Sequence, residues 1–414
     1  MGFFSPLFYF VGVGALLSFV ALPIFGAADE PPTQVADRAA NLDGLRGLLA
    51  LSVVFHHASI YHGQLTTAHW LPPPSAFYNE LGQASVGLFF VITAYLFWTK
   101  VMINAGRLDF VALLVSRAFR IGPVYLVATL IFIVANLWLD GFTLHIPAAS
   151  FAVENLQRLA LGLFDPGRIN GHPSVILAGV TWTLPYEWRF YLLLPLLALI
   201  ARLPRMVMPA ALAGCGLVAV LFAEIGARDL ALLLLFGGGI AWATIAHQAP
   251  LPEVRRPVVS ILVIVLLAVV AAFQTPFEAV WPPLLLIAAF AGIMQGGDLF
   301  GLLRLRATRR LGDISYPLYL MHGPVLAAAF AFQPVRDAAL GNPVAYWSIV
   351  IGIIAVALLV ALGVHVAVEM PGMALGRHWV KRMRRGHQTA VRGASEAVAA
   401  ARPGVPLPVR MRAD

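Results

Sequence analysis

The sequence predicts an all-α, polytopic membrane protein, and three observations lead to that fold class. Of its 414 residues, 60% are hydrophobic and only 12% are charged, whereas soluble domains carry about 25% charged residues. The apolar residues come in blocks of about 17 to 25, the length that a helix needs to cross the hydrocarbon core of a bilayer. No segment alternates apolar and polar residues as the strands of a membrane barrel do. Because backbone polar groups in lipid must be paired within the chain, we expect the blocks to be helices.

Eleven apolar blocks lie between charged or Pro/Gly-rich breaks. The first is interpreted as an extra N-terminal helix. A secretory signal begins with basic residues, whereas Met1 to Phe10 holds no Lys or Arg; a cleaved or peripheral segment is the alternative. The other ten form the core of a membrane domain expected over residues 41–372, after a helix and cytoplasmic linker over 1–40. The candidate spans are 6–26, 47–62, 84–103, 122–139, 178–201, 207–225, 229–247, 257–274, 280–297, 312–332 and 345–369.

The distribution of basic residues predicts the orientation of these helices. If residues 27–46 are cytoplasmic, nearly all Lys and Arg lie on the cytoplasmic side, as the positive-inside rule requires. The exceptions are Arg158, Arg168, Arg228 and Arg336 outside and Arg189 within a span. We therefore expect a protein of the cell (inner) membrane, with its N-terminus outside and its C-terminus cytoplasmic. The longest external connection, 140–177, is a candidate cover for an acceptor site.

The same charges limit the classes of partner and site. The excess of 28 Lys and Arg over 20 Asp and Glu is explained by cytoplasmic loops, so nucleic-acid binding is not expected. A lone cysteine, Cys215, excludes an internal disulfide and a cysteine metal cluster, and no metal site is expected. The tail over 373–414 is basic and rich in Ala, Pro and Arg, which favours a disordered cytoplasmic segment near anionic lipid.

Ionisable residues inside the predicted spans are functional candidates, because each costs roughly 2.5 to 3.5 kcal/mol at the bilayer centre. Besides Arg189 they are His57, Glu187 and His322. His57 lies about 20 Å from the cytoplasmic end of its span, and the other two about 13 to 15 Å from the nearer ends of theirs. We expect a carboxylate and two imidazoles to meet near mid-membrane, with Glu187 pairing one of the histidines. Buried hydrogen-bond partners and a structural ion pair are the alternative interpretation.

Three arginines are positioned to bind phosphate at the cytoplasmic side. Arg46 precedes His57 by eleven residues, which places both on one helix face about 16 Å apart. Arg117 and Arg120 share a face at i, i+3 just before a span. Guanidinium groups bind phosphates bidentately, and a deep imidazole is suited to general-base work. Interfacial anchoring is the alternative role for each arginine.

Together these segments resemble the membrane-integral acyltransferase-3 family. Thr93-Ala94, Pro185 and Met370 depart from the family pattern, and the chain resembles the stand-alone form without an external esterase-like domain. The matching stretches are Asp43-Gly44-Leu45-Arg46-Gly47 with His57, Val86 to Tyr95, Trp182 to Leu192, Leu311 to His322, and Glu369-Met370-Pro371.

The resemblance implies an O-acyltransferase for bacterial surface glycans that uses cytoplasmic acyl-CoA, commonly acetyl-CoA, as donor co-substrate and holds no permanent cofactor. It places the donor phosphates at Arg46, Arg117 and Arg120 and the thioester near His57, Glu187 and His322. We expect His57 either to take the acceptor's proton or to carry the acyl group, with Glu187 orienting it. An O-acyltransferase for a small-molecule acceptor and a non-catalytic glycan or acyl carrier are the alternatives.

Overall fold

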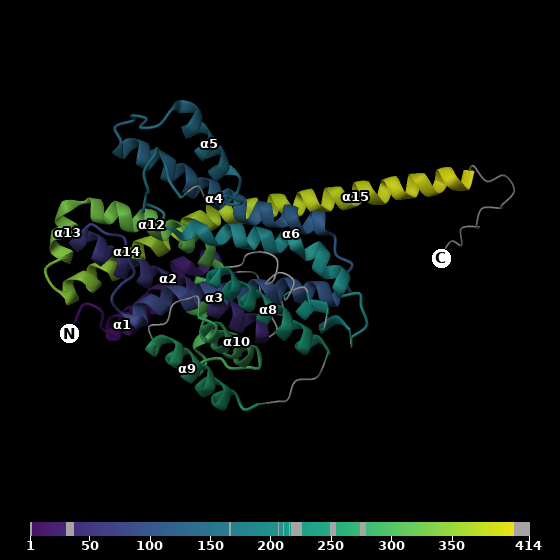
Figure 1. The fold of residues 1–414 in the computed structure, drawn as a ribbon, viewed down its shortest axis with the longest axis horizontal. Coiled ribbons are helices and arrows are strands. Elements are labelled where there is room, and N and C mark those ends of the chain that lie inside the picture. Colours follow the sequence, from purple (N-terminus) through teal and green to yellow (C-terminus); the bar gives the residue numbers. More distant parts are fainter. Residues whose placement is uncertain are drawn as a thin grey trace.

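The protein folds into a bundle of helices, as the sequence predicts. The computed structural model describes residues 2–29, 37–164, 167–205, 207–209, 211–214, 216, 226–248, 254–273 and 279–400. Within them there is no strand, only an isolated bridge between Ile169 and His172. Most helices run along the long axis of the molecule (Figure 1). The all-α fold class is confirmed.

Ten of the predicted blocks coincide with described helices, whereas most of 207–225 lies outside the described residues. A helix begins and ends where caps and chain breakers allow: Ser75 and Asp109 accept hydrogen bonds from backbone N–H groups of the first turns of α3 and α4. The helices are α1 (Pro6–Val20), α2 (Asp37–Thr67), α3 (Ala76–Ile103), α4 (Phe110–Leu139), α6 (Leu184–Ile200), α8 (Ala227–Gln248), α9 (Arg256–Ala272), α10 (Trp281–Met294), α12 (Ser315–Ala331) and α14 (Pro343–Val364).

The lengths of the helices make the chain a polytopic membrane protein, but they do not confirm the expected number of spans. By length and composition, four described helices can cross a bilayer: α3, α4, α8 and a continuous helix over Pro343–Arg385. A fifth span arises if α11 (Arg306–Asp313) and α12, which meet at 74°, count as one. The apolar helices α1, α9 and α10 are shorter.

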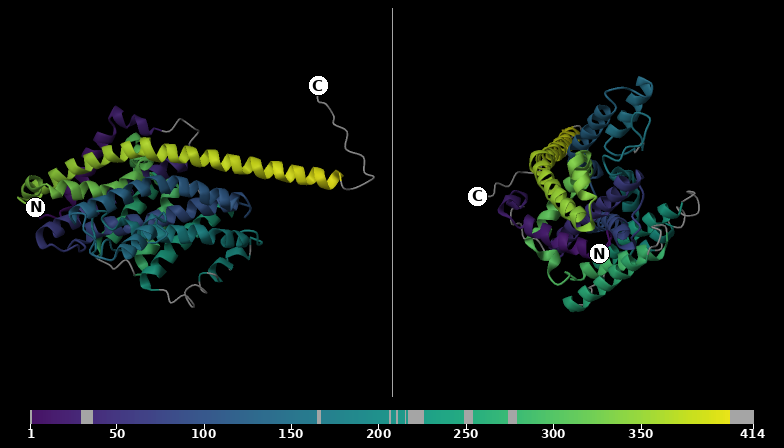
Figure 2. Two further views of the ribbon diagram at one scale, coloured as in Figure 1. Left: turned by 90° about the horizontal axis from the view of Figure 1, so that it is seen from above. Right: turned by 90° about the vertical axis from the view of Figure 1, so that its left-hand side faces the viewer.

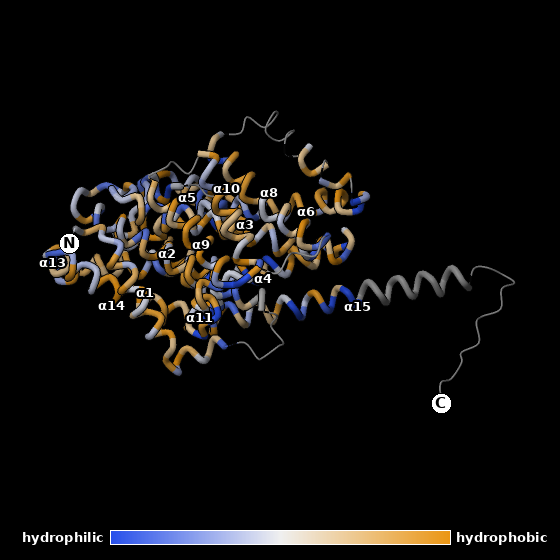
Figure 3. The backbone as a smooth tube through the Cα atoms, turned by 90° about the horizontal axis from the view of Figure 1, so that it is seen from below, coloured by the Kyte–Doolittle hydropathy of each residue, from blue (hydrophilic) through white to orange (hydrophobic). Residues whose placement is uncertain are grey.

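Three of the described α-helices lie wholly outside the expected spans, and one of them corrects an expectation. The external connection contains α5 (Ala148–Leu159), and α13 (Gln333–Ala339) follows α12. The tail, expected to be disordered, continues α14 through a π-helical turn, His365–Glu369, into α15 (Met370–Ala400); residues 401–414 lie outside the described part. Alanine, arginine and lysine favour helix, and an already formed span supplies the costly nucleus. Figures 2 and 3 show α15 projecting beyond the bundle, with polar residues along its described outer part.

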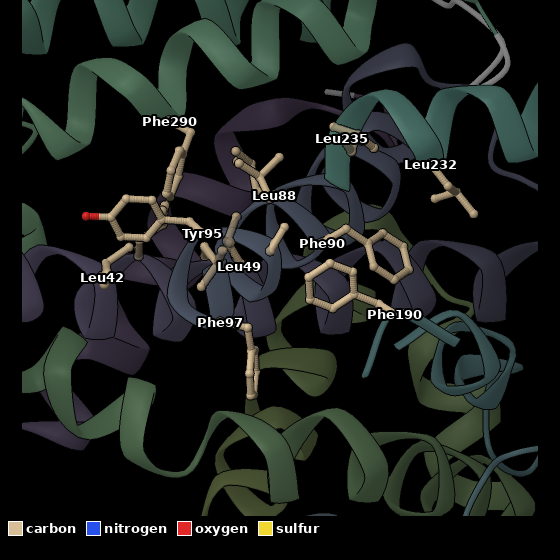
Figure 4. Packing of buried hydrophobic residues seen from close by; sticks show 14 of the residues in the cluster. Leu42, Leu49, Leu88, Phe90, Tyr95, Phe97, Phe190, Leu232, Leu235 and Phe290 are labelled. Carbon is tan, nitrogen blue, oxygen red and sulfur yellow. The ribbon is translucent and has the colours of Figure 1, made fainter. Parts of the chain in front are cut away.

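Two apolar clusters form the core. The larger is built mainly from α3, α4, α6 and α10, and Figure 4 shows Leu88, Phe90 and Phe190 packed within it. The buried Trp98 indole donates to Thr244 Oγ1 at 2.8 Å, which joins α3 to α8. The smaller cluster joins α1 to α2, α12 and α14, with Phe55 and Trp347 buried at its centre.

The N-terminal helix is an integral part of this fold. Arg310, only 3% exposed, donates to the carbonyls of Val20, Ala21 and Leu22 at the end of α1. The same guanidinium forms two hydrogen bonds to Asp29, at 2.8 and 3.0 Å. One side chain therefore satisfies the carbonyls that the end of a helix leaves unpaired and ties α1 to α11.

Glycines allow α2 to pack backbone to backbone against α11 and the turn before it, Leu302–Arg304. A Cβ added at Gly44 would lie 1.9 Å from the Leu303 carbonyl oxygen, and one at Gly312 would lie 2.1 Å from that of Asp43. Gly47 faces Thr308 in the same way, at 2.4 Å. Only residues without a side chain fit here. This close crossing sets the position of Arg46 relative to α12.

Candidate active site

A cavity of about 260 Å³ lies between α2, α3, α4, α6 and α12. Four cations and one carboxylate line it, together with hydroxyl groups and apolar side chains. The polar and charged lining residues are Arg46, Thr93, Lys100, Arg117, Arg120, Thr183, Glu187, Tyr191, Ser315, Tyr316 and Tyr319. All three arginines predicted to bind phosphate therefore meet in one cavity, Arg46 from α2 and the other two from α4.

Arg46 is held by partners on two elements. Its Nη2 donates to Ser315 Oγ at 3.1 Å, and its Nη1 lies 3.5 Å from a carboxylate oxygen of Asp43. Ser315 in turn donates to the carbonyl of Gly312 at 2.6 Å. A charged group with fixed partners is oriented before any ligand arrives, which reduces the entropic cost of binding.

The cations from α3 and α4 gather around Phe97. The Arg117 guanidinium lies 4.6 Å and the Lys100 ammonium 5.5 Å from the centre of this ring. Arg120, one turn after Arg117, has no hydrogen-bond or ion-pair partner in the described part of the chain. Like charges close together are unfavourable unless an anion or water lies between them. The arrangement suits a ligand with several negative charges.

Glu187 lies with these cations, not with the histidines as expected. Glu187 lies in the first turn of α6. The hydroxyl of Tyr191, one turn later, donates a hydrogen bond to its carboxylate at 3.0 Å. No hydrogen bond or ion pair joins Glu187 to His57 or His322 among the described residues. Arg189 is exposed and lies 5.2 Å from the ring centre of Tyr186, so it is not part of the cavity. Residues two apart on a helix point in different directions, which separates Glu187 from Arg189.

The two histidines form a pair of their own. His322 Nε2 lies 3.1 Å from His57 Nδ1, although the residues are 265 positions apart. His322 is fully buried, whereas His57 is partly exposed. The structure thus brings together the two predicted imidazoles, which neither line the cavity nor contact its carboxylate.

Hydrogen bonding assigns the protons of this pair. His322 Nδ1 lies 3.0 Å from the Leu318 carbonyl, and because a carbonyl only accepts, this nitrogen carries the proton. In a neutral ring Nε2 of His322 then accepts, so Nδ1 of His57 donates to it and to the Val53 carbonyl at 3.0 Å. The free basic nitrogen of the pair is therefore Nε2 of His57.

Tyr319 connects the cavity with the histidine pair. It lines the cavity, and its ring centre lies 6.3 Å from that of His322, one turn further along α12. Its hydroxyl donates to the Val180 carbonyl at 2.9 Å and lies 3.1 Å from Thr183 Oγ1. Tyr319 and Thr183 form the wall between the two parts of the site.

Sequence reasoning did not single out several of these residues. Lys100 was considered only for orientation, although its spacing of three residues from Phe97 indicates a shared helix face. The others lie inside the family motifs without having been assigned a role: Thr183, Tyr191, Ser315, Tyr316 and Tyr319. Their position inside a motif is the feature of the sequence that could have identified them as site residues.

Comparisons with known proteins agree with this architecture. A family model described as an acyltransferase domain matches residues 39–362. A protein of Bacillus subtilis (strain 168), named "Putative peptidoglycan O-acetyltransferase YrhL", is 25% identical over 367 residues, which cover 78% of this chain and 53% of the relative. The chain thus spans about half the length of this curated relative. No solved structure matches the chain. Because the family model covers most of the chain, including every residue of the cavity and the histidine pair, the protein belongs to the acyltransferase-3 family of membrane acyltransferases.

Proposed function

We propose that the protein transfers an acyl group, most simply acetyl, from cytoplasmic acyl-CoA to a hydroxyl group of a cell-surface glycan. The observation that carries this proposal is the cavity of four cations that ends, at Tyr319, one helical turn from a histidine pair with a free basic nitrogen. The relative named for peptidoglycan O-acetylation supports a glycan as the acceptor.

The charge of the cavity supports a donor with several phosphates. Arg46, Lys100, Arg117 and Arg120 outnumber the single carboxylate of Glu187. CoA carries a diphosphate and a 3′-phosphate, and charge-assisted hydrogen bonds from guanidinium groups are among the strongest that proteins make. In this proposal the nucleotide is held by these cations, and its pantetheine arm extends along Phe89 and Tyr319, which line the cavity, toward the histidines.

The chemistry is a direct transfer with general-base assistance. Nε2 of His57 removes the proton of the acceptor hydroxyl as its oxygen attacks the thioester carbonyl. The C–S bond breaks, and the imidazolium returns the proton to the leaving thiolate, which yields the ester and free CoA. Nε2 of His322 accepts a hydrogen bond from Nδ1–H of His57 and thereby stabilises the imidazolium. Glu187 then acts as a positioning residue for Tyr191 and the neighbouring arginines.

The proposed topology delivers the two substrates from opposite sides. The cations lie toward the predicted cytoplasmic ends of α3 and α4, whereas His57 lies toward the predicted external end of α2. This arrangement supports placing the protein in the cell membrane with a cytoplasmic C-terminus, because the donor is made in the cytoplasm and the glycan lies outside.

The test is transfer by the purified protein in lipid nanodiscs. Radiolabelled acetyl-CoA is supplied with de-O-acetylated peptidoglycan glycan strands, and both labelled product and released CoA thiol are measured. His57→Ala should lower transfer by about 100-fold or more, since general bases contribute about 10²- to 10⁴-fold. The exposed His247 near the end of α8 provides the control, because His247→Ala removes an imidazole away from both the pair and the loop that follows α2.

Three outcomes separate the alternatives. Full transfer by the His57→Ala protein would refute the mechanism. Acid-labile label trapped on the wild-type protein but absent from the His57→Ala protein would show that His57 carries the acyl group. Neither thiol release nor transfer by correctly inserted wild-type protein would contradict the proposed enzyme and favour a carrier.

A further inference from the structure

We propose that Trp70, held by Tyr61, forms an acceptor subsite beside His57 that binds the face of a pyranose ring. The inference rests on the proposed function, because it concerns the hydroxyl substrate of that same reaction. It assigns a role to the loop between α2 and α3, which the cavity does not include.

The first step in the argument is the geometry of the three rings. The Trp70 ring centre lies 6.3 Å from that of His57, and the two planes differ by only 18°. Tyr61 meets Trp70 edge to face, at 5.1 Å and 89°. Tyr61 is itself 4% exposed and stacks on Phe330 at 5.6 Å, so it is a fixed support. Trp70 is thereby held in one orientation, with its plane nearly parallel to the imidazole.

The loop that carries Trp70 is pre-organised. Ala68 has a φ of 60°, a left-handed conformation that costs roughly 1 to 2 kcal/mol for a residue with a Cβ. Leu71 precedes three successive prolines, 72–74, each of which fixes its own φ. The left-handed Ala68 also ends α2, where its N–H donates to the Gln64 carbonyl at 3.0 Å, so the end of the helix sets its conformation. A rigid loop loses little entropy when a ligand binds.

The second step is access. His57 is partly exposed but does not line the arginine cavity, so its exposed surface is reached by another route. Trp70 is also partly exposed, and its loop neighbours His69 and Leu71 are exposed, Leu71 by 61%. The loop is expected on the external side, opposite the side from which the donor enters. A ligand on Trp70 would therefore lie beside the His57 ring, whose centre is 6.3 Å from that of Trp70, without crossing the cavity.

The third step is the chemistry of recognition. A tryptophan offers a large, flat apolar surface with few rotatable bonds. The axial C–H groups of a pyranose pack on such a surface, which leaves the ring hydroxyls at the edge free for hydrogen bonding. A hydroxyl at that edge is the group that His57 must deprotonate. An interfacial tryptophan also serves as a membrane anchor, and Trp138, 68% exposed at the end of α4, is a tryptophan at the same predicted interface away from the pair.

The experiment compares three variants in the nanodisc assay with acetyl-CoA and de-O-acetylated glycan strands. Trp70→Ala should raise the KM for the strands about 2- to 10-fold, since one aromatic contact is worth about 0.5 to 1.5 kcal/mol. Trp70→Tyr keeps a flat ring and should restore most of the affinity. Trp138→Ala should leave this KM unchanged. CoA thiol release without acceptor, which reports a folded donor site, should be equal in all three variants and the wild type.

Each result decides the matter. An unchanged KM in the Trp70→Ala protein, an equal rise in the Trp138→Ala protein, or a parallel loss of acceptor-free thiol release would show that Trp70 is structural and overturn the inference. Failure of the proposed function looks different, because it appears in the wild type. There, thiol release without transfer to the strands would refute the glycan acceptor, and the subsite with it.

Discussion

Replacing Gly312 by alanine should disable the site from a position that touches no substrate. The added Cβ would lie 2.1 Å from the Asp43 carbonyl oxygen. A Cβ and a carbonyl oxygen are both fixed by the backbone, so neither can rotate away. Ordinary van der Waals contact begins at 3.4 Å. The α2 and α11 backbones would therefore have to separate by the difference, about 1.3 Å.

That displacement is large compared with the tolerance of the site. The Arg46 hydrogen bond to Ser315, 3.1 Å long, would exceed the distance at which such bonds form. A misplacement of about 1 Å costs about 100-fold in rate where orientation matters. Overpacking also costs about 1 to 3 kcal/mol of stability, which the fold is expected to survive.

The assay is acetyl transfer in nanodiscs, with kcat/KM for acetyl-CoA as the readout and thermal unfolding as the measure of folding. The matched control is Gly352→Ala in α14, because a Cβ there meets nothing within 4 Å. It should leave kcat/KM unchanged, whereas Gly312→Ala should lower it about 100-fold. A folded Gly312→Ala protein with wild-type kcat/KM would refute the idea that the close crossing of α2 and α11 positions the guanidinium.

Two further predictions concern charges inside and outside the cavity. Arg117→Ala and Arg120→Ala should each raise the KM for acetyl-CoA about tenfold or more, since a hydrogen bond to a charged group is worth about 1.5 to 3 kcal/mol. The exposed Arg309→Ala is the control, and an equal KM in all three variants would contradict phosphate binding. Hydrogen bonding from Arg310 lowers the pKa of Asp29 to about 2, below its usual 3.8, so the pair stabilises the fold above about pH 4 and less as pH falls toward 2. Because the Asp29 side chain is 29% exposed, we expect Asp29→Asn to lower Tm at pH 6 by the equivalent of about 1 kcal/mol and the gap to narrow at about pH 3; a gap that does not change with pH would contradict this.

The helices themselves were predictable because hydrophobic blocks are a local property of the chain. A long apolar block must bury its backbone polar groups in hydrogen bonds to itself whatever its neighbours are. The blocks at 84–103 and 122–139 accordingly lie within α3 and α4. The tail was mispredicted, because composition alone did not show that an Ala- and Arg-rich segment continues a helix that is already formed.

Part of the site was predictable for a different reason. A charged or titratable group in a span is expensive, so Arg46, His57, Glu187 and His322 stood out individually. Their helix faces followed from spacing, as did the shared face of Arg117 and Arg120. Which residues meet was not predictable, because contacts between helices depend on crossing angles and rotations that no local pattern records.

Glu187 and the histidines illustrate that division. The sequence by itself determined that this is an all-α membrane protein with a carboxylate and two imidazoles in its spans. Both conclusions depend on properties of a single helix: the length of its apolar block, and the free-energy cost of placing a titratable side chain within it. Only the tertiary structure decided that His57 pairs with His322, and that Glu187 faces the cations beside Tyr191. The physical reason is that partners are chosen where backbones approach closely, as the glycines of α2 and α11 allow here, and that approach is a property of two helices together.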